Sequence, residues 1–509
     1  MIAKLFSAAH LGIEAFPVEV EVDLTPGMFF YVTVGLPDAA VKESQNRILA
    51  ALKNSGFDMP VKRITVNLAP ADVRKEGSAF DLPIALAILA AQGIIPAERL
   101  ENLFIIGELA LDGRVKPVRG MLSVAVTVKA RHAAGLLCPA KNAGEAAVVD
   151  GVNVYPVETL AQAVGWLLGE TVIEKATPML FGPEVILEDE VDFSEVKGQH
   201  HVRRAVEVAA AGGHNMLMIG PPGSGKSMIA RRLSTVMPGW SLEEAIDCSR
   251  IHSVAGLLGR NVSVLSRRPF RAPHHTVSDA GLVGGGNNPV MPGEVSLAHH
   301  GVLFLDELPE FRRSALEVLR QPLEDGRVVI SRASSSVAFP ADFMMVCAMN
   351  PCPCGFSTDP VKECRCTAME MRRYRQKISG PLLDRIDIQV DVPAVKYQEL
   401  KGDAVDGESS AVIRARVDMA QSRQKKRFAK SRIYRNAQMG SKQIKTHCKV
   451  GTEAENLLKM AMERLGLSAR AHSRILKVAR TIADLAGCDD IRTEHVAEAI
   501  QYRALERGL

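Results

Sequence analysis

The sequence has few aromatic residues, little net charge and no long apolar segment. Phe, Trp and Tyr make up 5% of 509 residues, and the formal net charge is +4. No apolar run approaches the ~20 residues that cross a bilayer, so no membrane span is expected. The first residues lack the layout of a signal peptide. The small net charge does not by itself indicate a nucleic-acid partner, so the placement of basic residues has to decide that question.

Cysteine is scarce, and four of the nine cysteines lie close together. Without a secretion signal these cysteines indicate a reducing cytosol, so we expect a cytoplasmic protein. Cys352, Cys354, Cys364 and Cys366 form two C-x-C pairs. Four thiolates can close a tetrahedral structural Zn²⁺ site and leave no open position for catalysis. Because this spacing is tighter than that of a common zinc knuckle, four reduced cysteines in a mobile loop are the alternative.

The clearest motif is a glycine-rich loop that matches the phosphate-binding pattern G-x-x-x-x-G-K-[ST]. An apolar run precedes it and a helical pattern follows, which is the context this motif requires. Its glycines allow backbone N–H groups to point at phosphate oxygens beside a helix N-terminus. The predicted nucleotide-binding residues are Gly220, Pro221, Pro222, Gly223, Ser224, Gly225, Lys226 and Ser227. The lysine would reach the β- and γ-phosphates of ATP, and Ser227 would bind Mg²⁺.

A second apolar strand, followed by two carboxylates, has the Walker B pattern. Asp306 is expected to hold Mg²⁺ through its water shell, as a hard oxygen ligand does. Glu307 is expected to orient and activate the attacking water, since phosphoryl transfer needs positioning more than covalent help. A strand cap at the surface is the alternative, and the P-loop upstream argues against it.

Two further sites resemble those of AAA+ ATPases. Asn350 ends the apolar run 343–349 and matches the sensor 1 position, which contacts the γ-phosphate or the lytic water. Upstream of the P-loop, Val196 and Gln199 lie in a short segment that resembles an adenine pocket. A simple lead-in to the next helix is the alternative for these two residues.

Two arginine positions are also predicted from this resemblance. Arg385 lies where related ATPases carry an arginine finger that acts on a neighbouring subunit, which implies an oligomer. A salt bridge to Asp384 or Asp387 is the alternative. For the sensor 2 position in the last helical part we favour Arg470 over Arg474, which lies one turn along the same helix face.

Two N-terminal segments are similar to the proteolytic domain of the Lon protease family. They are residues 75–82 and 107–120. An ungapped alignment places the family's catalytic serine on Ala79 and its catalytic lysine on Leu122, and neither side chain can act as nucleophile or base. The resemblance therefore implies a Lon-like scaffold without peptidase chemistry. A shifted dyad on Ser78 is the alternative, although the nearest downstream lysine, Lys129, falls well past the dyad position.

Three segments together resemble magnesium-chelatase-related AAA+ proteins of the ComM/YifB type. They are residues 268–278, 292–311 and the run Asn350-Pro-Cys-Pro-Cys-Gly. The resemblance extends over nearly the whole chain and implies an α/β fold. It also implies a hexameric, ATP-hydrolysing DNA motor that promotes branch migration during natural transformation. The magnesium chelatases share this core but insert a metal into a porphyrin.

Patterning and resemblance together divide the chain into three globular parts, as its length suggests. Residues 1–170 predict a Lon-like α+β domain, and 171–190 a linker rich in proline, glycine and acid. Residues 191–395 predict the AAA+ core, in which 351–367 form the cysteine loop. The Ala-, Leu- and Glu-rich residues of 396–509 predict a helical lid.

Two regions are candidates for contact with single-stranded or branched DNA. Residues 325–339 predict a hairpin with Arg332 near its tip, and the glycine-rich 281–286 could form a second pore loop. The basic run 423–432 would attract any phosphate backbone. Further basic residues upstream are Arg372, Arg373 and Arg375. A plain surface hairpin and a solvated helix face are the alternatives, and the few aromatics do not support base stacking.

The sequence thus predicts a DNA helicase or translocase that forms a homo-hexamer and needs ATP and Mg²⁺, with zinc as a structural ion. An ATPase that remodels a protein partner, in the manner of a chelatase or a chaperone, is the alternative. A Lon-like peptidase is a third possibility, which the missing dyad disfavours.

Overall fold

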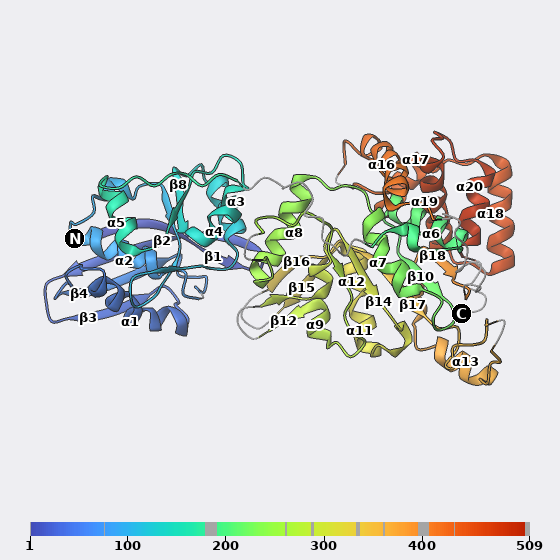
Figure 1. Ribbon diagram of the computed structural model, residues 1–509, viewed down its shortest axis with the longest axis horizontal. Helices are drawn as coiled ribbons and strands as arrows, with labels where there is room; N and C mark the ends of the chain where they lie inside the picture. Colours follow the sequence, from blue (N-terminus) through green and yellow to red (C-terminus); the bar gives the residue numbers. More distant parts are fainter. Residues whose placement is uncertain are drawn as a thin grey trace.

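The computed structural model describes residues 2–75, 77–178, 191–259, 262–286, 290–331, 336–359, 362–394, 407–431 and 433–503. The N-terminal domain and the C-terminal helices lie at opposite ends of an elongated molecule, with a parallel-sheet domain between them (Figure 1). The predicted α/β class, with a parallel sheet and a helical C-terminal region, is confirmed. The domain boundaries stay predictions, and 179–190 of the predicted linker lie outside the described residues.

The N-terminal domain is built on a seven-stranded sheet in the order β3-β4-β2-β1-β5-β8-β9. Buried and exposed residues alternate along β2, as expected for a strand with one face against helices. The strands are β1 (Ile2–Leu11), β2 (Glu14–Thr25), β3 (Phe30–Val34), β4 (Arg63–Ala69), β5 (Leu103–Ile105), β8 (Gly135–Pro139) and β9 (Val154–Val157). The helices are α1 (Ala39–Asn54), α2 (Asp81–Ala91), α3 (Met121–Ala130), α4 (Ala140–Ala147) and α5 (Leu160–Leu168). All residues of α2 are buried, so this helix forms the centre of the domain.

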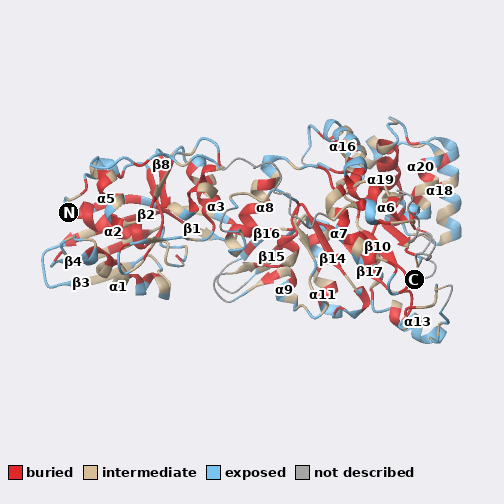
Figure 2. Cartoon of the chain, in the orientation of Figure 1, coloured by how far each residue is buried: buried red, intermediate tan, exposed pale blue. Residues whose placement is uncertain are grey.

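The central domain is a five-stranded sheet in the order β11-β14-β17-β10-β18, and each of its pairings is parallel. Its strands are β10 (Met216–Ile219), β11 (Phe270–Arg271), β14 (Val302–Leu305), β17 (Met344–Met349) and β18 (Ile388–Asp391). The three middle strands are apolar and buried along their whole length, as is typical of a sheet covered on both faces (Figure 2). Around it lie α6 (His200–Gly212), α7 (Lys226–Val236), α8 (Leu242–Ala255), α9 (Asp279–Val283), α10 (Glu294–Leu297), α11 (Arg313–Val318), α12 (Arg320–Asp325), α13 (Ala368–Arg375) and α14 (Gly380–Leu383).

The C-terminal region is helical throughout its described part. It contains α16 (Ser410–Arg427), α17 (Ser441–His447), α18 (Thr452–Leu465), α19 (Ala469–Leu485) and α20 (Thr493–Gln501). One apolar cluster continues from β10 and α6 into these helices, so the lid packs directly on the central domain. Among the described residues, no helix is both long and apolar enough to cross a membrane.

The predicted hairpin is confirmed as β15 (Arg327–Ser331) paired antiparallel with β16 (Ser336–Pro340). Its tip, including Arg332, lies outside the described residues. The glycine-rich segment forms the end of α9 and the short β12 (Gly284–Gly285), which pairs with β13 (Met291–Pro292). The basic run begins in the C-terminal part of α16 and continues after it to 431, while Arg432 lies outside the described residues, and the upstream arginines lie on α13.

The N-terminal domain is joined to the central domain through the turn between β1 and β2. Ile13 packs with Val337 and Phe339 of the hairpin in a buried cluster. Arg250 of α8 donates hydrogen bonds to the Ile13 carbonyl at 3.2 Å and to the Ser123 hydroxyl at 3.2 Å. These contacts join the base of the hairpin to the N-terminal domain.

A substitution at Phe339 tests the packing between the N-terminal domain and the hairpin. Phe339→Ala should destabilise the protein by about 3–5 kcal/mol, because it leaves a cavity in a buried cluster. Thermal unfolding should therefore show a midpoint several degrees lower than that of the unaltered protein. Val329→Ala is the matched control, since this side chain on the paired strand is 36% exposed. Equal midpoints for the two variants would contradict the packing described here.

Candidate functional site

The predicted nucleotide site forms where parallel strands end. The register pairs Ile219 with Met349 and Leu305 with Cys347, so β10, β14 and β17 finish at one edge of the sheet. The loops that follow carry the P-loop, the two carboxylates and Asn350. They enclose a cavity of about 360 Å³. Its lining residues are Pro222, Gly223, Ser224, Gly225, Lys226, Ser227, Met228, Asp306, Glu307, Met349 and Asn350.

The P-loop is closely packed at its first glycine. A Cβ on Gly220 would lie 2.1 Å from the Val392 carbonyl oxygen, so no larger residue fits beside β18. Gly225, with a φ of +90°, directly precedes α7 and turns the chain into that helix. The Gln199 amide supports the loop from behind, donating to the carbonyls of Ser224 at 3.0 Å and Pro393 at 2.8 Å.

Lys226 lies inside the loop. Its ammonium donates to the carbonyls of Gly220 at 2.7 Å and Pro221 at 2.9 Å, and it is 3.4 Å from the Asn350 side-chain oxygen. Burial lowers the pKa of Lys226, because the charged form loses water, while Asp306 opposes this shift. The structure thus places Lys226 and Asn350, two predicted site residues, beside each other at one cavity.

The two predicted magnesium ligands are in direct contact. The Ser227 hydroxyl donates to an Asp306 carboxylate oxygen at 2.6 Å. A hydroxyl and a carboxylate are oxygen donors of the kind Mg²⁺ prefers, and Mg²⁺ ordinarily retains several waters and contacts the phosphates of its nucleotide. The donor set therefore fits a magnesium ion that is shared with bound phosphates.

Glu307 contacts a residue that the sequence analysis left without a role. It adopts a left-handed backbone conformation, with φ +52°, and its backbone N–H donates to Asp306 at 2.9 Å. His275 Nδ1 lies 3.4 Å from the Glu307 carboxylate. His275 follows β11, which runs parallel to β14, and this topology explains why the two side chains meet. His275 lies within residues 268–278, one of the segments that carry the family resemblance. The resemblance did not predict its contact with Glu307.

The adenine-pocket prediction is only partly matched by the geometry. Val196 is buried in the apolar cluster around β10, and Gln199 contacts the back of the P-loop. Neither residue lines the cavity beside the phosphate-binding loop. The role of these residues toward adenine therefore stays a prediction.

Arg385 is not among the residues that line the cavity. Its buried guanidinium pairs with Glu324 and donates to the Pro381 carbonyl at 2.5 Å. The alternative expected from sequence, a salt bridge from Arg385 to Asp384 or Asp387, is therefore wrong in its partners. Glu324 lies 61 positions upstream on α12, so only the tertiary fold brings it to Arg385.

The two sensor 2 candidates differ in environment. Arg474 pairs with the buried Asp387, which also contacts His214 at 3.0 Å. Burial alone would raise the pKa of Asp387, but Arg474 and His214 outweigh it, and the pKa lies well below its ordinary range. The Arg470 side chain is 67% exposed and lies 3.9 Å from Asp384. Arg470 is thus the more accessible of the two, and the choice between them for sensor 2 stays a prediction.

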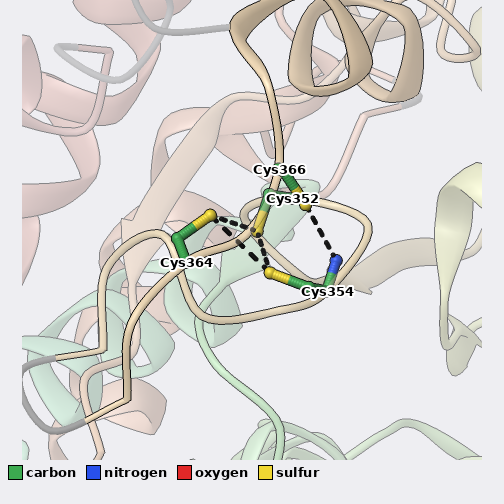
Figure 3. A group of neighbouring side chains, drawn as sticks. All are labelled: Cys352, Cys354, Cys364 and Cys366. Carbon is green, nitrogen blue, oxygen red and sulfur yellow. Dashed lines mark hydrogen bonds between the residues drawn. The ribbon is translucent and has the colours of Figure 1, made fainter.

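The four clustered cysteines converge on one point (Figure 3). The Cys352 sulfur is 3.4 Å from that of Cys354 and 3.7 Å from that of Cys364, and the latter two are 3.6 Å apart. A Zn–S distance of about 2.3 Å in a tetrahedron implies sulfurs about 3.8 Å apart, close to these values. Cys366 completes the group, and all four sulfurs lie within 4.8 Å of one another.

The chemistry of these sulfurs also suits a metal. All four cysteines are free thiols, and their separations are far longer than a disulfide of about 2.05 Å. The donor set therefore fits a closed, four-coordinate structural zinc site.

Among the described residues of the N-terminal domain, no contact joins Ser78 to a lysine. The Ser78 hydroxyl donates to Glu108, and Lys75 bonds to the Pro70 carbonyl. Leu122 is buried in an apolar cluster against which Ala79 packs. These contacts support a scaffold without the peptidase chemistry of the Lon family.

Comparison with known sequence families supports one assignment for all three parts. Residues 192–400 match the family described as "Magnesium chelatase, subunit ChlI". Residues 20–142 match "Subunit ChlI of Mg-chelatase", and residues 407–503 match "Magnesium chelatase, subunit ChlI C-terminal". The matches together extend over most of the chain.

Individual relatives narrow this assignment. The chain is 43% identical to the competence protein ComM of Haemophilus influenzae, and the alignment includes 100% of this chain and 98% of ComM. It is 42% identical to YifB of Escherichia coli, over 98% and 97% of the two chains. The 38 kDa magnesium-chelatase subunit of Rhodobacter capsulatus is 26% identical over 31% of this chain and 50% of its own length. The chain therefore belongs to the ComM/YifB family of magnesium-chelatase-related AAA+ ATPases.

Proposed function

We propose that this ATPase is a hexameric DNA motor that promotes branch migration in recombination during natural transformation. The observation that carries the proposal is a complete P-loop and Walker B site in a chain that matches a competence protein over its full length. Lys226 holds the phosphates, Ser227 and Asp306 hold Mg²⁺, and Glu307 activates the attacking water. Asn350 and Arg470 contact the γ-phosphate from the sheet edge and from the lid.

The proposed ring places each ATP between two subunits. Arg385 of one subunit supplies the positive charge that stabilises the transition state in the site of its neighbour. The pair with Glu324 of α12 holds the guanidinium, which is buried in the single chain, until the neighbouring subunit engages it. In one subunit Arg385 lies outside the residues that line the phosphate cavity, which agrees with a role in a second copy of the chain.

DNA contact is proposed for the hairpin and for two basic segments. The base of the β15–β16 hairpin packs on the N-terminal domain, so the hairpin is held on a rigid support. Arg372 and Arg373 are exposed on α13, and Lys425 and Lys426 lie in the last turn of α16. Such side chains bind phosphates without reading sequence.

Zinc completes the proposed set of cofactors. Cys352, Cys354, Cys364 and Cys366 would hold one Zn²⁺ ion, and the ion would fix the loop between β17 and α13. The four residues fill the coordination sphere, so the ion has a structural role.

A protein-remodelling ATPase is the second candidate function. The specific observation in its favour is that the matching families are all described by a magnesium-chelatase subunit. This candidate predicts that a partner protein, rather than DNA, stimulates ATP turnover.

The role of Glu307 can be tested by an isosteric change. Glu307→Gln should bind ATP as the unaltered protein does, while hydrolysis falls by about 10²–10⁴-fold, because the amide cannot accept a proton from water. Fluorescent-nucleotide titration and phosphate release measure the two quantities. Glu310→Gln is the control, since Glu310 is exposed and pairs with Lys377 outside the cavity. Loss of turnover in both variants would contradict the assignment of Glu307.

The DNA motor is tested with a synthetic four-way junction. We expect DNA to stimulate ATP hydrolysis and ATP to drive migration of the junction. Replacing Arg372 and Arg373 by Ala should weaken DNA binding uniformly across sequences and reduce its dependence on salt. The matched control replaces two exposed lysines of the lid, Lys442 and Lys459. If ATP turnover ignores DNA and no junction binds, the motor proposal is wrong and the remodelling candidate gains support.

The shared site makes a prediction for mixed rings. Arg385→Ala should keep nucleotide binding and lose about 10³–10⁵-fold in turnover, the usual contribution of such an arginine. Mixing Arg385→Ala with Glu307→Gln subunits should restore part of the activity, because one type of interface then has both functional residues. Glu324→Gln is the control for the intrachain ion pair, since it keeps the guanidinium. Activity of the mixture no greater than the sum of its components would refute the shared site.

A further inference from the structure

The cysteine cluster lies next to the nucleotide site. Cys352 is two residues from Asn350, whose side chain lines the phosphate cavity. The preceding residue, Met349, accepts a hydrogen bond from the Gly220 backbone N–H at 3.2 Å. The strand end that carries Asn350 is therefore tied to the P-loop on one side and to the cysteine loop on the other.

The cysteine loop also touches the P-loop directly. A Cβ built on Gly355 would lie 2.6 Å from Pro222 Cδ and 2.7 Å from Pro222 Cγ. Gly355 adopts φ +87°, and its N–H donates to the Cys352 carbonyl at 2.9 Å. The turn between the two cysteine pairs thus packs with its backbone against a proline that lines the phosphate cavity.

Helix α13 closes the loop on its far side. Arg375 donates to the Pro351 carbonyl at 3.3 Å, and Tyr374 is buried beside the Asn350 backbone. Cys352 is fully buried at the centre of these contacts, while the other three cysteines are partly exposed. Any change in how the four sulfurs are held will therefore move Pro222, Asn350 or both.

We infer that metal binding by the four cysteines and nucleotide binding by the P-loop are coupled, each raising the affinity for the other. The inference rests on the zinc site proposed above and adds a regulatory role to it. A bound metal fixes the turn at Gly355, which presses Pro222 into the conformation that binds phosphates. By linkage, nucleotide then increases metal affinity by the same factor as metal increases nucleotide affinity.

The chemistry of thiols indicates what happens to the cysteine loop when no metal is bound. Metal binding requires thiolates and releases their protons, so a loop without metal holds neutral thiols or repelling charges in place of a rigid tetrahedron. Loss of the metal therefore weakens nucleotide binding.

Cobalt titration of the full-length protein tests the coupling. Co²⁺ bound by thiolates has visible absorption, so metal affinity can be read without measuring activity. We use Glu307→Gln subunits with saturating MgATP, in which ATP persists, and compare them with the same subunits without nucleotide. Metal affinity should rise by about fivefold or more, the usual range of such coupling. Adding Lys226→Ala, which prevents nucleotide binding, corrects for direct binding of Co²⁺ to ATP.

Gly355→Ala separates the contact from the metal site. It leaves all four cysteines in place but forces a Cβ against Pro222. Co²⁺ should therefore still bind, while the effect of nucleotide on Co²⁺ affinity should nearly disappear. Gly151→Ala is the matched control, because Gly151 has a φ of +85° and nothing within 4 Å of its added Cβ. This control carries the same backbone strain and should retain the full coupling.

The possible results have distinct meanings. Absence of a thiolate–cobalt spectrum would refute the metal site itself and, with it, the coupling. Normal cobalt binding with the same affinity in the presence and absence of nucleotide would refute the coupling alone. Full coupling in Gly355→Ala would overturn the inferred path through Pro222.

Discussion

The parallel register of β10, β14 and β17 is the constraint on which the rest of the structure depends. It ends three buried strands at one edge, so that the P-loop, Asp306, Glu307 and Asn350 meet although they are far apart in sequence. The strands can end together because each is apolar along its length and covered on both faces. The polar residues of the site therefore follow the last residues of these strands, where the chain leaves the apolar core.

The P-loop at this edge of the sheet packs closely against the neighbouring elements. Gly220 lies against the Val392 carbonyl, and Gly355 of the cysteine loop lies against Pro222. Gln199 holds the P-loop from behind through two backbone carbonyls. A loop confined on three sides cannot shift unless the chain after β18, Gln199 or the cysteine loop shifts with it. Interiors packed at this density transmit small displacements rather than absorbing them.

A second rigid connection joins the motor to the N-terminal domain. Arg250 binds the turn after β1, and Ile13 fills an apolar cluster with the base of the hairpin. Buried guanidinium groups are costly unless their hydrogen bonds are satisfied, which fixes this turn in one position. The N-terminal domain, in whose described residues no contact joins Ser78 to a lysine, therefore packs against the element proposed to contact DNA.

The sequence by itself determined the P-loop, the Walker B carboxylates, the hairpin and the four cysteines, because each is a short motif whose geometry is local. It also predicted Asn350 as a residue of the same nucleotide site, because this polar residue ends an apolar strand. The tertiary structure alone decided the pairs His275–Glu307, Arg385–Glu324 and Arg474–Asp387. These partners come from different elements, so no spacing encodes them. The contact of Gly355 with Pro222 is of the same kind, because only the folded chain brings the cysteine loop onto the phosphate-binding loop.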